Sequence, residues 1–508
     1  MFGKIQSACI QGIEGQTIDV EVDISNGIPQ FHIVGLPDSA IRESVERVRA
    51  AIRNSGFEFP LQRITINLAP ADVRKEGAAF DLAIAAGILH TSGQLAFDEP
   101  DRCLFIGELA LDGTVRGIPG VLALIDHAKN SGFKTVYLSK ENADEASIIT
   151  GIKLKPIEHL AQFKHNINDI NDLSVKTNQH ADDSPSLNAE DFADVKGHEH
   201  AKRALMIAAA GMHNILFIGP PGSGKTMLMR RLPGILPEMT ENEAMEVTKI
   251  YSITGRMKHV SSLMRHRPFR SPHHTISAAG LIGGGRIPKP GEVSLAHRGV
   301  LFLDELPEFP RAALEALRQP LEDKKVTIAR TSAVYAYPSD FILAASMNPC
   351  PCGYWGAESE AHDCRCTPLQ IASYRSKISG PLADRIDLQV EIPAVDYLTA
   401  SQSAPGMSTA QMREKVEHAH RIQLQRKTFN SNLKGRMLGE YCRLPDDAQS
   451  LMREAFAALG LSMRAYDRLL RIARTIADLE MSEHIQKSHV AEALQYRCLD
   501  RKYHQAIR

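Results

Sequence analysis

The stretch Gly219-Pro220-Pro221-Gly222-Ser223-Gly224-Lys225-Thr226 decides the fold of this chain. The apolar run NILFI at 214–218 precedes it and predicts a buried strand, and a helix is expected over 227–232. A Gly-rich turn between a strand and a helix lets backbone N–H groups surround a phosphate, next to the partial positive charge of the helix N-terminus. Lys225 is expected to reach the β- and γ-phosphates of a nucleotide, and the Thr226 hydroxyl to coordinate Mg²⁺.

Two later apolar runs end in polar residues that match this loop. Asp304 and Glu305 follow the run GVLFL at 299–303, and Asn348 ends the run FILAASM that begins at 341. We expect Asp304 to hold Mg²⁺ through water, Glu305 to polarise the attacking water and Asn348 to orient that water. The structural alternatives are a capped turn for the acidic pair and an ordinary turn before a proline for Asn348. Together with the loop, these residues predict an ATP- and Mg²⁺-dependent hydrolase.

The composition is that of a globular protein without an overall charge bias. Of its 508 residues, 43% are hydrophobic, and 59 basic side chains are balanced by 60 acidic ones. Any surface for nucleic acid must therefore be a local basic patch. The N-terminus lacks the apolar core of a signal peptide, and the most apolar stretch, at 78–89, is shorter than the ~20 residues of a membrane span. We expect a cytoplasmic protein with no membrane partner.

Changes of pattern divide the chain into four parts. Residues 1–165 indicate a mixed α/β domain, and 166–188, rich in Asn, Asp and Ser, indicate a linker or a long surface loop. Residues 189–395 hold the nucleotide motifs, and helical periodicity dominates 396–508.

Several elements can be placed by their periodicity. Strands are expected at 17–24, 63–68 and 135–138, and helices at 39–55 and 80–89. In the helix expected at 465–479, an apolar stripe is expected to be buried, with the arginines on other faces; these arginines are Arg468, Arg471 and Arg474.

Four cysteines form two close pairs, Cys350 with Cys352 and Cys364 with Cys366. Four thiolates on one loop can hold a metal tetrahedrally, and Zn²⁺ is the default metal for such a set. One residue separates the members of each pair, whereas zinc sites usually have two or more. Iron–sulfur ligation, reversible disulfides and a loop without metal are the alternatives to structural zinc.

These motifs resemble the AAA+ superfamily, and specifically its magnesium-chelatase-like branch. Four segments closely resemble the ComM/YifB family: RSPHHTIS (270–277), PGEVSLAH (290–297), NPCPCG (348–353) and SGPLADRID (379–387). The resemblance extends over the whole chain. It implies an AAA+ P-loop core with a C-terminal helical lid over 396–508, assembled into a ring, usually a homo-hexamer, with ATP between neighbouring subunits.

The resemblance also assigns residues to the nucleotide. Arg385 resembles the arginine finger given to a neighbour's γ-phosphate, with an ion pair to an adjacent aspartate as the structural alternative. Arg464 resembles the sensor-2 arginine of the lid, and Arg468 is the alternative. Val195 and Gly197 lie in a segment that resembles the lining of an adenine pocket.

Two segments resemble the hairpins that project into the pore of such rings, at 276–298 and 326–337. Lys289, Arg286 and Arg330 are candidates for gripping a polyanion, and a solvated surface charge is the equal alternative for each.

The first 165 residues resemble the proteolytic domain of Lon. The protease's serine corresponds to Ala79 and its lysine to about Leu122. A serine–lysine dyad needs a hydroxyl and an amine, and neither residue supplies one. We therefore expect a Lon-protease-like α/β domain that lacks proteolysis and serves assembly or binding.

The resemblance implies a helicase that promotes branch migration while single-stranded DNA is integrated during natural transformation. Single-stranded and branched DNA, further copies of the chain and a recombinase are then the expected partners. Seven basic residues against two acidic ones at 413–436 are compatible with DNA, although a solvated helix face explains them equally well. The alternative is a protein-remodelling ATPase, either chelatase-like or an unfoldase. The Lon-like domain is the feature that we take to disfavour a chelatase motor.

Overall fold

The computed structural model describes residues 1–164, 190–257, 262–285, 288–329, 334–356, 363–393 and 406–497. The linker expected at 166–188 lies outside these residues, as do Arg286 and Arg330. The described residues form two compact units. The first lies within Met1–Asp182, Glu241–Met264 and Thr327–Tyr337, and the second within Asp183–Thr240, Arg265–Val326 and Pro338–Arg508. No described helix has the length and apolarity that crossing a membrane requires.

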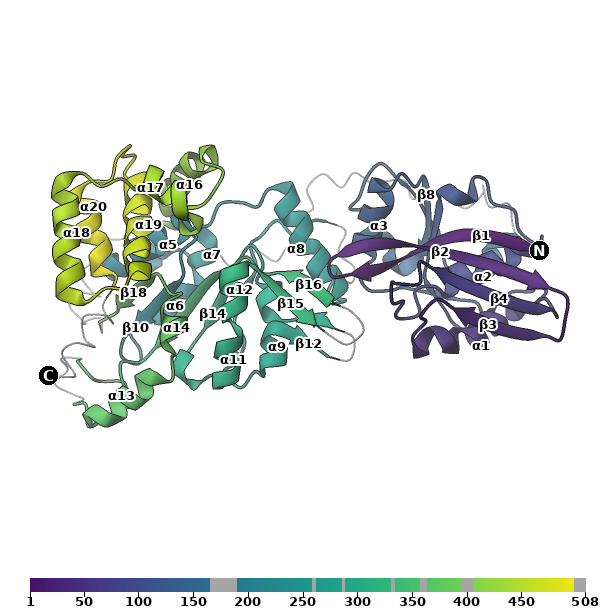
Figure 1. Cartoon of the computed structure of the whole chain (residues 1–508), viewed down its shortest axis with the longest axis horizontal. Coiled ribbons are helices and arrows are strands. Elements are labelled where there is room, and N and C mark those ends of the chain that lie inside the picture. The colour runs from purple at the N-terminus through teal and green to yellow at the C-terminus, as the bar shows by residue number, and fades with distance from the viewer. Residues whose placement is uncertain are drawn as a thin grey trace. The chain divides into compact units, whose positions relative to one another are not determined.

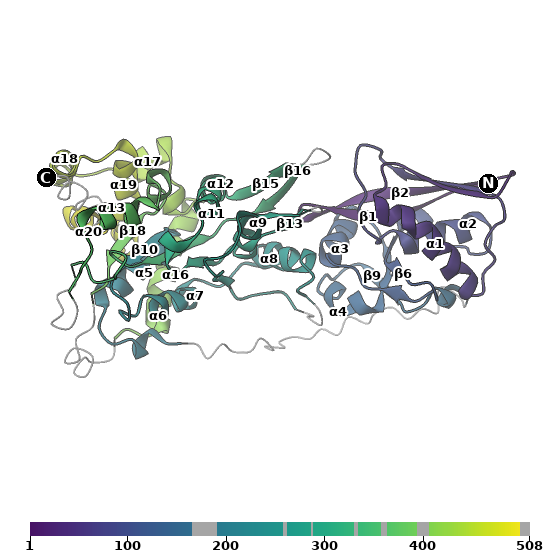
Figure 2. The same cartoon turned by 90° about the horizontal axis from the view of Figure 1, so that it is seen from below.

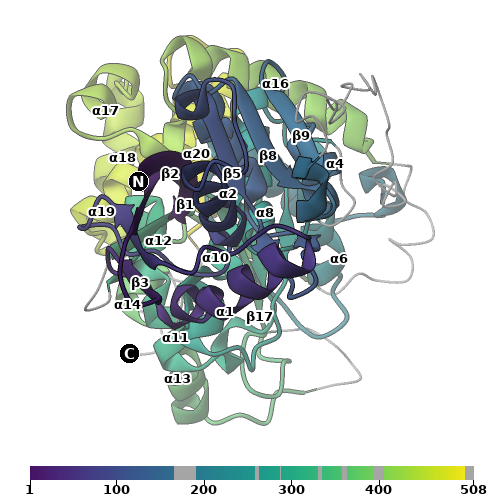
Figure 3. The same ribbon diagram turned by 90° about the vertical axis from the view of Figure 1, so that its right-hand side faces the viewer.

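A seven-stranded mixed sheet forms the centre of the first unit, in the order β3-β4-β2-β1-β5-β8-β9. Its strands are β1 (Phe2–Gln11), β2 (Glu14–Ser25), β3 (Gln30–Val34), β4 (Arg63–Ala69), β5 (Cys103–Ile106), β8 (Thr135–Ser139) and β9 (Lys153–Ile157). The long strands β1, β2 and β4 run side by side in Figure 1, and Figure 3 shows β8 next to β9. A small hairpin of β6 (Glu108–Leu109) and β7 (Val115–Arg116) adjoins the sheet.

Alternation along β5 explains why helices cover both faces of this sheet. Cys103 and Phe105 pack into one core cluster, and Leu104 and Ile106 pack into another. Successive strand residues point to opposite faces, so both faces are apolar and both need a cover. The cover consists of α1 (Ser39–Asn54) and α2 (Asp81–Thr91) in the first cluster, and α3 (Val121–Asn130) with α4 (Ala143–Ala146) in the second.

Two segments that follow the nucleotide loop in sequence also belong to this first unit. One contains α8 (Glu241–Ile253). The other is the outer part of a hairpin made by β15 (Lys325–Ala329) and β16 (Val334–Pro338), which lie beside each other in Figures 1 and 2.

The second unit has a five-stranded, all-parallel sheet in the order β11-β14-β17-β10-β18. Its strands are β10 (Ile215–Ile218), β11 (Phe269–Arg270), β14 (Val300–Leu303), β17 (Ile342–Met347) and β18 (Leu388–Glu391). The three central strands β14, β17 and β10 are buried along their whole length, which explains their unbroken apolar sequences.

Helices surround this sheet. They are α5 (Glu199–Gly211), α6 (Lys225–Arg230), α7 (Leu232–Ile235), α11 (Arg311–Ala316), α12 (Arg318–Asp323), α13 (Pro368–Ser376) and α14 (Gly380–Ala383). A short hairpin of β12 (Gly283–Gly284) and β13 (Lys289–Pro290) stands between α9 (Ala278–Ile282) and α10 (Glu292–Leu295). A hairpin therefore forms within the predicted segment 276–298.

The C-terminal part of this unit is helical. It contains α16 (Thr409–Gln425), α17 (Gly435–Tyr441), α18 (Asp446–Leu459), α19 (Met463–Leu479) and α20 (Lys487–Gln495). Figure 2 shows α16 close to α5, and the apolar residues of both helices lie in the core cluster that includes β10 and β18. The predicted helical lid is thus packed on the sheet that carries the nucleotide loop.

The structure corrects the sequence prediction for α19 in one respect. Arg468 and Arg474 were expected outside the buried stripe, yet both are buried, at 6% and 2% exposure. Arg474 pairs with Asp478 at 2.9 Å, and Arg468 lies 3.8 Å from Asp384 and from Asp387. An amphipathic pattern counts apolar residues alone and misses guanidinium groups that are buried with carboxylate partners.

Candidate functional site

The nucleotide loop leaves β10 at the carboxyl edge of the parallel sheet and enters α6. Gly222 and Gly224 have φ values of 75° and 78°, which favour glycine and turn the backbone tightly. Lys225, 8% exposed, donates from Nζ to the carbonyl oxygens of Gly219 and Pro220 at 2.7 Å each. Burial lowers the pKa of Lys225, while the nearby carboxylates of the acidic pair act in the opposite direction.

The metal-binding half of the site lies at the end of β14. The Thr226 hydroxyl donates to the Asp304 carboxylate at 2.8 Å, so the two predicted Mg²⁺ ligands are neighbours. Ser346 donates to the other oxygen of Asp304 and fixes the carboxylate in place. Sequence reasoning missed Ser346, although it is a hydroxyl within an otherwise apolar strand and this was a usable signal.

The strand order explains how Asn348 joins the site. Because β17 lies between β14 and β10, its end falls between the acidic pair and the nucleotide loop. The Asn348 amide oxygen accepts from Lys225 Nζ at 3.4 Å. The structure thus brings together Lys225, Thr226, Asp304 and Asn348, which were predicted from three separate stretches of sequence.

Glu305 occupies a left-handed backbone position, with φ of 54°. Its carboxylate is 56% exposed and lies 3.7 Å from Nδ1 of His274, in the segment that follows the neighbouring strand β11. A non-glycine residue in this conformation is uncommon and marks a site that the surrounding structure holds in place. His274 was not predicted, although it belongs to the quoted motif at 270–277.

The predicted adenine segment lies beside the nucleotide loop. Val195 is buried, and Gly197 has φ of 71° where the chain turns into α5. The next residue, His198, places its Nε2 3.8 Å from the position that a β-carbon on Gly224 would occupy. The segment therefore lies close to the nucleotide loop, and its role in binding a base stays a prediction.

Arg385 and Arg464 lie together at the opposite edge of the same sheet. Both line a cavity of about 230 Å³ that also includes Asn214, the residue before β10. Since Gly219 follows β10, the four residues of this strand, about 13 Å long, separate the cavity from the nucleotide loop. Among the described residues that line the cavity, none belongs to the loop.

Arg385 pairs with Glu322, whose pKa the guanidinium lowers, and not with either adjacent aspartate. Arg464 is exposed, whereas Arg468 is buried next to two aspartates, and burial lowers the pKa of its guanidinium. Of the two lid arginines, Arg464 is therefore the one free to reach a ligand from outside.

The basic stretch at 413–436 is divided between structural and exposed side chains. Arg413 donates to the Gly234 carbonyl oxygen at 2.9 Å, and Arg426 makes two 2.8 Å contacts with Asp478. The exposed members are Lys415, Arg421, Lys427, Lys434 and Arg436. Lys289 is likewise exposed, on the β12–β13 hairpin.

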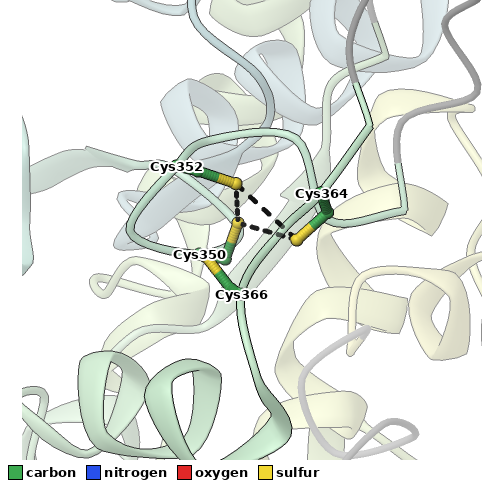
Figure 4. Close-up of side chains that lie close together, drawn as sticks. All are labelled: Cys350, Cys352, Cys364 and Cys366. Atoms are coloured by element: carbon green, nitrogen blue, oxygen red, sulfur yellow. Dashed lines mark hydrogen bonds between the residues drawn. The ribbon is translucent and has the colours of Figure 1, made fainter.

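The four cysteines meet, as Figure 4 shows. Cys350, Cys352 and Cys364 have sulfur–sulfur separations of 3.3, 3.7 and 3.6 Å, and the Cys366 sulfur completes a set within 4.8 Å. Tetrahedral Zn–S bonds of ~2.3 Å place sulfurs ~3.8 Å apart, so the set fits zinc. A backbone hydrogen bond from Tyr354 is the largest of the contributions that lower the pKa of Cys352 to about 6. Burial and hydrogen bonds with the neighbouring sulfurs raise the pKa of Cys364 to about 12, so of these two groups Cys352 alone is favoured as the thiolate that binds a metal.

The cysteine loop contacts the nucleotide loop directly. Gly353, with φ of 89°, lies so close to Pro221 that an added β-carbon would be 2.6 Å from its ring. Trp355 stacks under the Arg375 guanidinium at 4.3 Å, and Arg375 donates to the Pro349 carbonyl oxygen at 3.2 Å. These contacts tie the cysteine loop to Asn348 on one side and to the phosphate-binding turn on the other.

In the first unit, the two positions that correspond to a protease dyad are apolar. Ala79 is half-buried before α2, and Leu122 is fully buried in α3. Both pack in or against the same apolar cluster.

Comparison with protein families gives three matches. A model described as magnesium chelatase, subunit ChlI, matches residues 191–400, and its C-terminal counterpart matches 406–497. A model described as subunit ChlI of Mg-chelatase matches residues 20–142. The N-terminal domain therefore does not separate this chain from chelatase subunits, contrary to our expectation.

Two of the similar proteins cover almost the whole chain, and a third covers less than a third of it. The competence protein ComM of Haemophilus influenzae is 43% identical over 502 residues, which are 98% of this chain and 97% of that protein. The YifB protein of Escherichia coli K12 is 43% identical over 499 residues, 96% of each. Lon protease 2 of Bacillus subtilis is 29% identical over 163 residues, 30% of this chain and 28% of the protease.

Three findings indicate the same family: the two full-length relatives, the matches to chelatase-type models and the geometry of the nucleotide site. The family relationship implies ATPase activity with ATP and Mg²⁺, on a fold of an AAA+ core, a helical C-terminal region and a Lon-like N-terminal part. The chain belongs to the ComM/YifB family of magnesium-chelatase-like AAA+ proteins.

Proposed function

We propose that this protein is an ATP-driven, ring-shaped DNA motor, a helicase that promotes branch migration and the integration of single-stranded DNA. Natural transformation and homologous recombination in the cytoplasm are its setting, with a recombinase as a partner. The observation that carries the motor part is the separation of the ATP-site residues between two edges of one sheet. The DNA part rests on the likeness to a competence protein.

The separation argues for shared sites. Lys225 and Asp304 lie at the carboxyl edge of the sheet, whereas Arg385 and Arg464 line a cavity at the amino edge. A head-to-tail contact between copies would set one edge against the other, and such contacts close into rings. A homo-hexamer then places the arginines of each subunit at the γ-phosphate held by its neighbour, where a guanidinium accelerates hydrolysis.

Within each site we propose one role for each predicted residue. Lys225 and the backbone of the turn bind the phosphates, Thr226 and Asp304 hold Mg²⁺, and Glu305 and Asn348 position the lytic water. Val195 and Gly197 line the pocket for the adenine base of ATP. Lys289 and the exposed basic residues at 415–436 are proposed to contact the DNA backbone, which would give affinity without sequence preference.

We also assign a structural zinc to the four-cysteine loop. The sulfur separations fit the ion, and the loop joins Pro221 of the nucleotide turn to the segment after Asn348. A closed four-sulfur site stiffens a loop and leaves no position for catalysis.

The test is ATP turnover by the full chain, measured alone and with single-stranded DNA, forked DNA or a protein substrate, together with strand displacement on branched DNA. The proposal predicts stimulation by DNA and displacement that depends on Lys225. Stimulation by a protein and not by DNA would instead support a protein-remodelling ATPase and refute the DNA motor. The Lys225→Ala variant controls for contaminating ATPases.

A further inference from the structure

The first unit holds two segments that the sequence places among the ATPase motifs. One is α8, which five residues separate from the end of α7. The other is the outer part of the β15–β16 hairpin, 327–329 and 334–337, here called the arm. The arm contacts the loop Lys75–Asp81, which contains Ala79, and α8 contacts the turn Gly117–Gly120, which lies just before Leu122.

The arm docks through buried tyrosines. Tyr335 is 9% exposed and donates its phenol to the Glu76 carboxylate, while Tyr337 is 2% exposed. The backbone also approaches closely, since a β-carbon on Gly12 would lie 2.6 Å from the Ala336 carbonyl oxygen. The arm therefore lies against the turn between β1 and β2 and against the loop that contains Ala79.

The helix α8 docks on the other loop. The amide of Gly120 donates to the Ser252 carbonyl oxygen at 3.1 Å, and the Ser252 hydroxyl contacts Glu145. Lys249, 7% exposed, pairs with Asp126 at 2.7 Å and with Glu14 at 3.0 Å. A buried ammonium that loses its carboxylate partners is strongly destabilising, so these ion pairs specify where α8 docks.

Each docked segment is joined to the nucleotide site by a short piece of chain. β16 ends at Pro338, and β17 begins at Ile342 and runs to Met347, next to Asn348. α8 follows α6 and α7, and α6 begins with Lys225 and Thr226. A displacement of β17 or of the nucleotide turn must therefore move the docked segments or strain a connection of a few residues.

We propose that the surface formed by Lys75–Asp81 and Gly117–Gly120 is an internal docking surface whose ligands are the arm and α8. Through this surface the N-terminal unit responds to the nucleotide state of the ATPase site. Apolar Ala79 and Leu122 suit this role, because a receptor for folded segments needs packing where a protease needs a hydroxyl and an amine. The inference rests on ATP binding and is independent of DNA.

The test is amide hydrogen exchange of the full chain with and without a non-hydrolysable ATP analogue and Mg²⁺. In the wild type, the analogue is expected to change exchange in peptides covering 75–81 and 117–122. Gly12→Ala places a methyl group against the arm and should raise exchange at 334–337 by about tenfold or more and abolish the analogue's effect at 75–81. Tyr335→Phe, which removes the donor to Glu76, should act in the same direction.

Gly93→Ala is the matched control. Gly93 has φ of 75°, close to the 68° of Gly12, but an added β-carbon there would have no atom within 4 Å. In both variants an alanine must adopt a left-handed backbone conformation, with a similar loss of stability. Gly12→Ala also places a methyl group against the arm, whereas Gly93→Ala does not. The proposal is overturned if the wild type shows no change at 75–81, if neither variant releases the arm, or if Gly12→Ala releases it and the response persists. Binding of the analogue, measured in the same samples, identifies a failure of the nucleotide site itself.

Discussion

Replacing Arg385 by alanine separates catalysis from stability. The side chain lies at the amino edge of the sheet and pairs with a 61% exposed Glu322, so losing this pair should cost less than ~1 kcal/mol of stability. Losing a guanidinium from the γ-phosphate should cost about 4 kcal/mol in the barrier, or roughly 10³-fold in kcat. We therefore expect Arg385→Ala to fold, assemble and bind ATP normally while turning it over about a thousandfold more slowly.

Mixed rings extend the experiment. A Glu305→Gln subunit cannot activate water but keeps its Arg385. It can therefore supply this arginine to the ATP bound by the intact nucleotide loop of an Arg385→Ala neighbour. In rings formed at random from equal amounts, about a quarter of interfaces pair an intact loop with an intact arginine, and steady-state turnover should recover toward that fraction.

The assay is phosphate release, with ring composition verified by mass spectrometry of tagged subunits. Normal turnover by Arg385→Ala alone would refute the arginine's role. No recovery in rings shown to be mixed would refute the division of the site between two subunits.

Three further predictions concern other parts of the chain. Lys225→Ala should abolish ATP binding, and Glu305→Gln should retain ATP without turnover, both measured by equilibrium binding and phosphate release; unchanged turnover in either contradicts the site. The purified chain should contain about one zinc, and Cys350→Ser should lose it by elemental analysis, with less than about half a zinc in the wild type counting against the assignment. Arg47→Ala should lower the free energy of unfolding of the N-terminal unit by ~3 kcal/mol in chemical denaturation, because it leaves the 1% exposed carboxylate of Asp81 without its ion pair. An effect below ~1 kcal/mol would show that this pair is dispensable.

The local features of the fold were predictable because the spacing of apolar residues and the positions of glycine-rich turns indicate where strands and helices begin and end. The alternation at 63–68 predicted β4, which spans Arg63–Ala69, and the Gly-rich turn predicted the passage from β10 to α6. Asp304 and Asn348 were predicted because parallel strands deliver their carboxyl ends to one edge.

Other features depended on contacts between distant residues. No sequence period indicates that Ser346 holds Asp304, or that Arg468 is buried against aspartates some eighty residues earlier. The same holds for α8 and the arm, which the motif order assigns to the ATPase core and the structure places in the N-terminal unit. Arg385 lies at the amino edge because it precedes β18 and β18 runs parallel to β10, and the direction of a strand is a property of the whole fold.

The contact between Gly353 and Pro221 has a practical consequence for handling the protein. A chelating buffer or an oxidant would act first on the cysteines, but the damage would be measured as weakened nucleotide affinity, because the phosphate-binding turn rests on that loop. Preparations that differ in their content of the proposed zinc are therefore expected to differ in apparent activity although their sequence is the same.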